Sequence, residues 1–227
     1  MSIKQFVFGA VMLFTTSMFA QQSQPAADVN EKEIPLQAQQ LDLAGQLVRY
    51  GYQTKAALPL IQAVQIYKSL NVVEASDGRT KQEQGVQVAT GITKTDLVSF
   101  DEAKLLADAT KYADGNKSLL TLIKDAQKST RGAYPGPVRK VDRVLAGHSD
   151  IWPIKFRGGE SAYVVVSGDG DTDLDLYVYD GNGNYITSDT DGSDGCVVAF
   201  NPRWTGTFYI KIMNLGRVYN NYVLVTN

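Results

Sequence analysis

Residues 161–180 read SAYVVVSGDGDTDLDLYVYD, and this stretch decides the fold of the second half of the chain. Two runs of β-branched and aromatic residues, Ala162–Val166 and Leu174–Tyr179, flank a joint made of glycine and aspartate. Such a pattern is typical of a β-hairpin. In the second run, leucine and valine alternate with aspartate and tyrosine. This run therefore predicts a strand with one face toward a core and the other toward water or a ligand.

Around this hairpin, the chain from residue 138 onward keeps the period of two that is typical of strands. Glycine, asparagine and aspartate separate the runs, as expected of turns. We expect strands at Val141–Ala146, Ile151–Phe156, Ala162–Val166, Leu174–Tyr179, Tyr185–Ser188, Val197–Phe200, Thr207–Met213 and Tyr222–Thr226. Short strands at this spacing, with no helix between them, predict an eight-stranded antiparallel jelly-roll β-sandwich over residues 138–227.

The first half of the chain shows helical periodicity instead. Apolar residues at spacings of three and four predict a small bundle of four helices in the domain 34–131. The first helix is expected to end at Gly51, and the second to run from a cap at Thr54 to Leu70. A capping box, Ser99–Glu102, is expected to begin the third helix. Leu119–Ala126 marks the fourth, whereas Asn71–Asp96 gives no readable pattern.

The remaining segments predict an exported chain. Lys4 and the apolar run that ends near Ala20 are typical of a signal peptide over residues 1–20. A flexible lead-in follows at 21–33, and a linker rich in proline and glycine separates the two domains at 132–137. We therefore expect a periplasmic or secreted bacterial protein without a membrane span after cleavage. Cys196 is the single cysteine, so no intramolecular disulfide can form.

Composition and motifs narrow the class of function. The net charge of −2 argues against a nucleic-acid partner. His148 is the single histidine, and neither a zinc-type spacing nor a phosphate-binding loop is present. We therefore predict that the protein is not an enzyme, and an uncharacterised hydrolase remains the last alternative. The oligomeric state cannot be predicted.

Two groups of side chains are candidate binding sites. Carboxylates crowded into neighbouring turns suit Ca²⁺, which prefers hard oxygen ligands, although aspartate is also a common turn residue. The predicted metal ligands are Asp169, Asp171, Asp173, Asp175, Asp189 and Asp191. Aromatic side chains could instead form a platform for sugar rings, although such residues often pack at the rim of a sandwich. The predicted ligand-binding residues are Tyr177, Tyr179 and Trp204.

An ordered series of short motifs runs through the predicted sandwich. It comprises Phe156–Glu160, Val164–Val166, Asp173–Tyr177, Asp180–Gly183, Phe200–Pro202, Gly206–Ile210 and Asn221–Leu224. The series resembles the bacterial pre-peptidase C-terminal domains over about Val138–Asn227, and it does not cover the helical half. The resemblance implies a noncatalytic accessory domain, in some members able to bind calcium or an extracellular polymer. We therefore expect an exported binding protein with an extracellular or envelope protein or polysaccharide as partner, the alternative being a carbohydrate-binding module.

Overall fold

The computed structural model describes residues 27–29, 34–74, 81–84, 94, 98–128 and 137–227. The predicted signal peptide lies outside these residues, as do most of the lead-in and of the linker. In the described part of the chain, no helix is long and apolar enough to cross a membrane.

Four helices fold from the first half, as the periodicity predicts. They are α1 (Leu36–Thr54), α2 (Ala57–Ser69), α3 (Glu102–Tyr112) and α4 (Lys117–Lys128). The expected end at Gly51 was wrong, because α1 continues to Thr54 and ends at Lys55 in a left-handed conformation. Gly51 serves packing instead: a Cβ there would lie 2.5 Å from Leu60 Cδ2. Thr54 therefore closes α1 and does not cap α2.

The start of α3 also differs from the expected capping box. Asp101 is the N-cap, and its Oδ1 accepts a hydrogen bond of 2.7 Å from the Lys104 backbone N–H. Ser99 lies two residues earlier, where its hydroxyl oxygen accepts a bond from the Asp101 N–H at 3.2 Å. Aspartate is as good a cap as serine, so sequence alone could not choose between the two positions.

All eight strands predicted after residue 138 are present, most of them longer by a few residues. They are β4 (Val138–Val144), β5 (His148–Phe156), β6 (Ala162–Gly168), β7 (Leu174–Tyr179), β8 (Tyr185–Asp189), β9 (Gly195–Pro202), β10 (Gly206–Asn214) and β11 (Asn220–Thr226). Three short strands come from the first half: β1 (Ala27–Val29), β2 (Val73–Glu74) and β3 (Lys81–Gln84). Two of these three fall in the segment that gave no readable pattern.

The strands form two sheets packed face to face. The six-stranded sheet has the order β1-β9-β6-β11-β4-β2, and the five-stranded sheet has the order β3-β5-β10-β7-β8. Neighbouring strands are antiparallel except for β2 and β4, which are parallel. The strands from the first half lie at the edges of these sheets. The predicted linker therefore does not separate the residues that build the sandwich from those that precede it.

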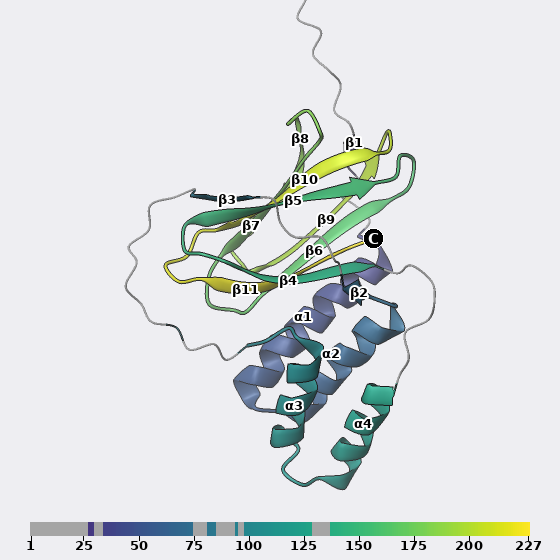
Figure 1. Cartoon of the computed structure of the whole chain (residues 1–227), viewed down its shortest axis with the longest axis vertical. Helices are drawn as coiled ribbons and strands as arrows, with labels where there is room; N and C mark the ends of the chain where they lie inside the picture. The colour runs from purple at the N-terminus through teal and green to yellow at the C-terminus, as the bar shows by residue number, and fades with distance from the viewer. Residues whose placement is uncertain (1–26, 30–33, 75–80, 85–93, 95–97, 129–136) are drawn as a thin grey trace, which may run out of the picture.

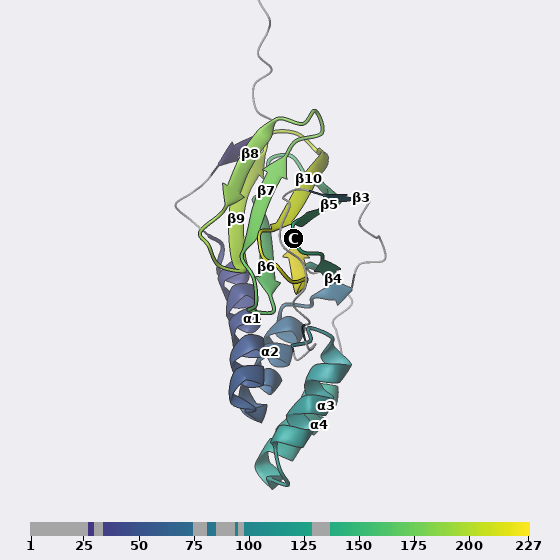
Figure 2. The same cartoon turned by 90° about the vertical axis from the view of Figure 1, so that its left-hand side faces the viewer.

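The four helices lie on the outer side of the six-stranded sheet, and α1 packs directly against it. Figures 1 and 2 place them on the same side of the sandwich in both views, and α1 contacts β6 and β9. One hydrophobic core joins the helices to sheet side chains that point outward, namely Tyr163, Val165, Ala199, Val223 and Val225. A second core fills the space between the sheets. Strand β6 is consequently buried on both faces along its whole length.

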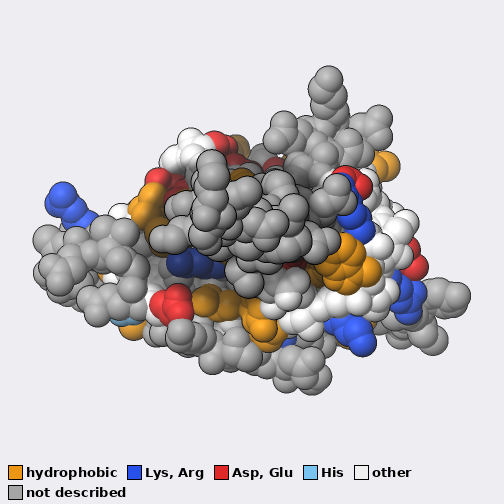
Figure 3. All heavy atoms as spheres, turned by 90° about the horizontal axis from the view of Figure 1, so that it is seen from above, with side chains coloured by type: hydrophobic (Ala, Val, Ile, Leu, Met, Phe, Trp, Pro, Cys, Tyr) orange, Lys and Arg blue, Asp and Glu red, His pale blue; other side chains and the backbone are white. Residues whose placement is uncertain are grey.

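The charges are spread over the end of the sandwich that lies farthest from the helices. In Figure 3, the acidic, basic and hydrophobic side chains that can be seen among the described residues are interspersed and do not gather by sign. The five-stranded sheet faces away from the helices, so the helices leave its outer face accessible to a ligand.

Candidate functional site

Three tyrosines lie in a row across the outer face of the five-stranded sheet. Tyr179 on β7 pairs with Tyr209 on β10 and with Tyr185 on β8. The rings of Tyr179 and Tyr185 meet edge to face, with centroids 6.2 Å apart. Tyr185 is 54% exposed and Tyr209 is 38% exposed. Because residues directly opposite each other on paired strands share a face, we define Tyr185, Tyr179 and Tyr209 as the tyrosine row.

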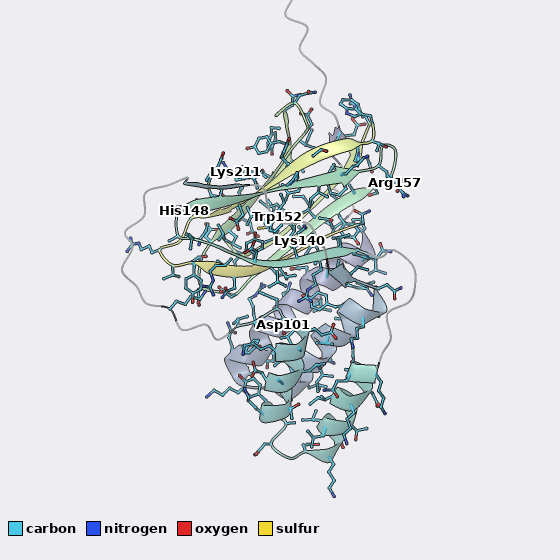
Figure 4. All side chains as sticks on the ribbon, viewed as in Figure 1. Asp101, Lys140, His148, Trp152, Arg157 and Lys211 are labelled. Atoms are coloured by element: carbon cyan, nitrogen blue, oxygen red, sulfur yellow. The ribbon has the colours of Figure 1, made fainter. Side chains whose placement is uncertain are left out.

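Polar side chains lie beside this row. Tyr177 pairs with Lys211 on β10 and with Ser188 on β8, one step along the same face. The Tyr177 hydroxyl donates to Asp175 Oδ2 at 2.8 Å. Burial, followed by this bond and the charge of Asp175, raises the pKa of Tyr177 to about 12, so the phenol stays protonated. Figure 4 labels Lys211 on the sheet that lies away from the helices. The face thus combines aromatic rings with hydrogen-bonding groups.

The structure separates the three predicted ligand-binding residues. Tyr177 and Tyr179 share the outer face, whereas Trp204 lies in the turn between β9 and β10 and is 47% exposed. Its ring packs near the start of β10, where a Cβ at Gly206 would lie 3.6 Å from Trp204 Cδ1. The sequence analysis did not select Tyr185 or Tyr209. The alternation within Thr207–Met213 was a signal that could have placed Tyr209 on the face opposite to Ile210.

The predicted metal ligands fall into two groups, and the first is paired with a lysine. Lys94 Nζ lies 2.5 Å from Asp169 Oδ2 and 2.9 Å from Asp171 Oδ2. It also donates to the backbone oxygen of Tyr219 at 3.0 Å. An ammonium group therefore lies beside both carboxylates in this part of the acidic loop.

Asp169 is held by the end of the sandwich as well as by the lysine. Its Oδ2 accepts hydrogen bonds from the Asn221 backbone N–H at 2.8 Å and from Asn221 Nδ2 at 3.0 Å. Its Oδ1 is buried and has no hydrogen-bond partner among the described residues. Burial raises the pKa of the Asp169 carboxyl in spite of the bonds from Lys94 and Asn221.

The second group surrounds the ends of β7 and β8. Burial, then the charges of Asp175, Asp191 and Asp194, raises the pKa of Asp173. Asp189 Oδ2 accepts a bond of 2.8 Å from the Val197 N–H. Within the described ranges, no three acidic, histidine or cysteine side chains come together as a metal site. Calcium therefore stays a prediction from the sequence, and we derive no function from it.

The contacts of His148 do not support a catalytic role for this residue. The His148 Nδ1 lies 2.7 Å from the backbone oxygen of Ala146. The neighbouring Ser149 hydroxyl is buried and makes no hydrogen bond to any described residue. The carboxylate of Asp150 accepts from the Tyr222 hydroxyl at 2.8 Å. Figure 4 shows His148 at one end of β5 and Arg157 just beyond the other. The absence of catalysis stays a prediction.

Comparisons with known proteins find a partial similarity to a solved structure. No family model matches the chain, and no curated protein matches it. Among solved structures, the chain is similar to the pre-peptidase C-terminal domain of a collagenase from Bacillus anthracis. The identity is 13%, the match covers 39% of this chain and 87% of that chain, and the TM-score is 0.35.

Proposed function

We propose that the protein is a noncatalytic, exported binding protein and that the tyrosine row is its ligand-binding surface. The observation that carries this proposal is the position of Tyr185, Tyr179 and Tyr209 on the sheet face that points away from the helices. Exposed aromatic side chains that gather on one face are typical of interaction sites, whereas single ones are ordinary.

The shape of this face favours an extended ligand over a small molecule. Neighbouring strands lie about 4.8 Å apart, so the row spans roughly 10 Å across β8, β7 and β10. Small-molecule sites are concave and enclose most of their ligand. A sheet face with a line of rings can instead contact successive units of a polymer. The partner is accordingly an extracellular or envelope polysaccharide or protein.

The tyrosine row favours a polysaccharide among these partners. The faces of aromatic rings present a flat apolar surface, while their hydroxyl groups and the adjacent Lys211 and Ser188 can hydrogen-bond to sugar hydroxyls. These features favour a carbohydrate-binding module, the alternative that the sequence left open.

The architecture supports such a role. We infer a jelly roll, because the strands from β4 to β11, counted as one to eight, have the orders 6-3-8-1 and 2-7-4-5 in the two sheets. Two interlocked Greek keys produce this order, and many lectin-type domains are built in this way. Fold alone does not define function, so the proposal depends on the tyrosine row.

Sedimentation with insoluble polymers tests the proposal. The full chain is mixed with peptidoglycan, chitin and cellulose, and with gelatin coupled to beads as a protein ligand. We expect binding to one of the polysaccharides, and a loss of about tenfold in affinity for Tyr179→Ala and for Tyr209→Ala, the scale of one buried aromatic contact. Tyr50→Ala is the matched control, since Tyr50 is 57% exposed on α1.

Two results would contradict the proposal. Equal binding by the Tyr179 and Tyr209 variants would show that the tyrosine row is not the binding surface. Binding to gelatin alone, with both variants impaired, would keep the surface and replace the polysaccharide with a protein partner.

A further inference from the structure

Lys94 is held in place from several sides, which is unusual for a lysine. Its side chain is 7% exposed, and that of Asp169 is 1% exposed. The ammonium also contacts Asp171, whose side chain is 50% exposed, and lies 4.8 Å from the centroid of the Tyr219 ring. Lysine side chains usually keep their charge in water and lose much rotamer freedom when fixed. A fixed and buried amine next to a buried carboxyl group is an arrangement in which the two can react.

The two oxygens of Asp169 have different surroundings. Oδ2 accepts two hydrogen bonds from Asn221 in addition to its contact with Lys94 Nζ. Oδ1 is buried without a hydrogen-bond partner among the described residues. Donors fixed on one oxygen stabilise negative charge that develops there when a nucleophile attacks the carbonyl carbon. The other oxygen is free to accept a proton and depart.

We propose that Lys94 and Asp169 form an intramolecular isopeptide bond. In this reaction the amine nitrogen of Lys94 attacks Cγ of Asp169, a C–N bond forms, the C–Oδ1 bond breaks, and one water molecule leaves. The ammonium loses two protons, and the departing oxygen takes up both, so no net charge is gained or lost. No oxidant, metal or other reactant is consumed.

Asp171 and Asn221 have separate roles in this step. One proton passes from the Lys94 ammonium to Asp169, which produces an uncharged pair that is easier to bury than an ion pair. Asp171, 2.9 Å from the nitrogen, accepts the second proton and passes it to the leaving hydroxyl group. Asn221 holds Oδ2 through the tetrahedral adduct with its backbone N–H and its side-chain amide. Proximity replaces the activation that amide formation in solution requires.

The bond would connect parts of the chain that are 75 residues apart in sequence. Lys94 lies between β3 and α3, and Asp169 lies in the loop between β6 and β7. The link would fasten Lys94, which lies between β3 and α3, to the end of the sandwich. This link acts independently of the tyrosine row, so the two proposals can fail separately.

Mass spectrometry of the full chain tests the proposal directly. After denaturation, the wild-type protein should be lighter by one water molecule than its sequence requires, and digestion should yield a branched peptide that joins Lys94 to Asp169. Lys94→Arg keeps the positive charge but should show the full mass. The pair Lys111–Asp108, with its atoms 2.7 Å apart and the lysine side chain 72% exposed, is an internal control and should yield separate peptides.

A second variant tests the mechanism apart from the fold. Asp171→Asn keeps the size of the side chain but removes the proton carrier, and we expect its rate of linkage after refolding to fall by at least about tenfold. Wild-type protein that retains its full mass and yields two separate peptides after prolonged incubation would overturn the proposal. Linkage at the wild-type rate in Asp171→Asn would overturn the role of Asp171.

Discussion

Substitution of Gly45 by alanine tests the packing of α1 on the six-stranded sheet. A Cβ at residue 45 would lie 2.1 Å from Ser167 Oγ and 2.4 Å from Ser167 Cβ on β6. Unstrained contacts between heavy atoms are about 3.5–4.0 Å, so helix and strand would have to separate by roughly 1.5 Å. Overpacking of this kind costs about 3 kcal/mol at the upper end of its usual range.

The helix propensity of alanine acts in the opposite direction, so the sign of the change in stability shows whether α1 contacts β6. Alanine is favoured over glycine in a helix interior by about 1 kcal/mol. If α1 did not contact β6, Gly45→Ala would therefore stabilise the protein. With the contact present, we expect a net loss of about 2 kcal/mol, which lowers the melting temperature by about 4–8 °C for a chain of this size.

Variants that combine Gly45→Ala with a substitution at Ser167 complete the test. Their stability is measured by far-ultraviolet circular dichroism during thermal and urea unfolding. In a Ser167→Gly background, both close atoms are gone, and Gly45→Ala should no longer destabilise. In a Ser167→Ala background, the 2.4 Å contact with Cβ remains, so Gly45→Ala should still destabilise. An unchanged or higher melting temperature for Gly45→Ala alone, or equal rescue by both Ser167 substitutions, would refute the packing argument.

Three further predictions concern the acidic turns and the domain boundary. Asp173→Asn should raise the free energy of unfolding by about 0.5 kcal/mol at neutral pH. Burial and neighbouring aspartates raise the pKa of Asp173 in the folded state, so wild-type stability falls as the pH rises through that pKa. Urea titrations should show the gain vanish below pH 3.8, and a gain that persists there contradicts the assignment. Calcium should leave the melting temperature equal to that in chelator, because Asp169 is already engaged by Lys94, as an ion pair or through the proposed bond; a rise of several degrees in calorimetry would support the calcium site predicted from the sequence. The fragment 138–227 should lack a cooperative unfolding transition, because it lacks β1, β2, β3 and the helices that cover its six-stranded sheet; a sharp transition would restore the independent domain that the sequence predicts.

Local periodicity was sufficient to find the helices and the main strands. The run Leu174–Tyr179 was predicted with the bounds that the structure shows, since alternation of apolar and polar residues marks a strand with one buried face. The unbroken apolar run of β6 carried a further signal that was not used. A strand without polar alternation is typical of burial on both faces, which the helices and the second sheet provide here.

Features that depend on distant parts of the chain could not be predicted. Lys94 lies in a polar segment, and nothing near it in sequence indicates a partner in the loop that contains Asp169. Strands β2 and β3 have two and four residues, too few for a period to be recognised. Of the tyrosine row, the sequence analysis selected Tyr179 and missed the other two residues. The reason is that alternation gives the face on which each residue lies but not which strands are neighbours.

The position of β11 sets the order in which this chain can fold. Asn220–Thr226 is the last strand in sequence, yet it lies inside the six-stranded sheet, between β6 and β4. During synthesis, β6 and β4 have no partner on their inner sides until these residues have left the ribosome. The apolar faces of the helices lack a complete sheet to cover for just as long. The polypeptide therefore remains without its central pairing until residues 220–226 have been synthesised, and loss of β11 would divide the sheet and not merely shorten it.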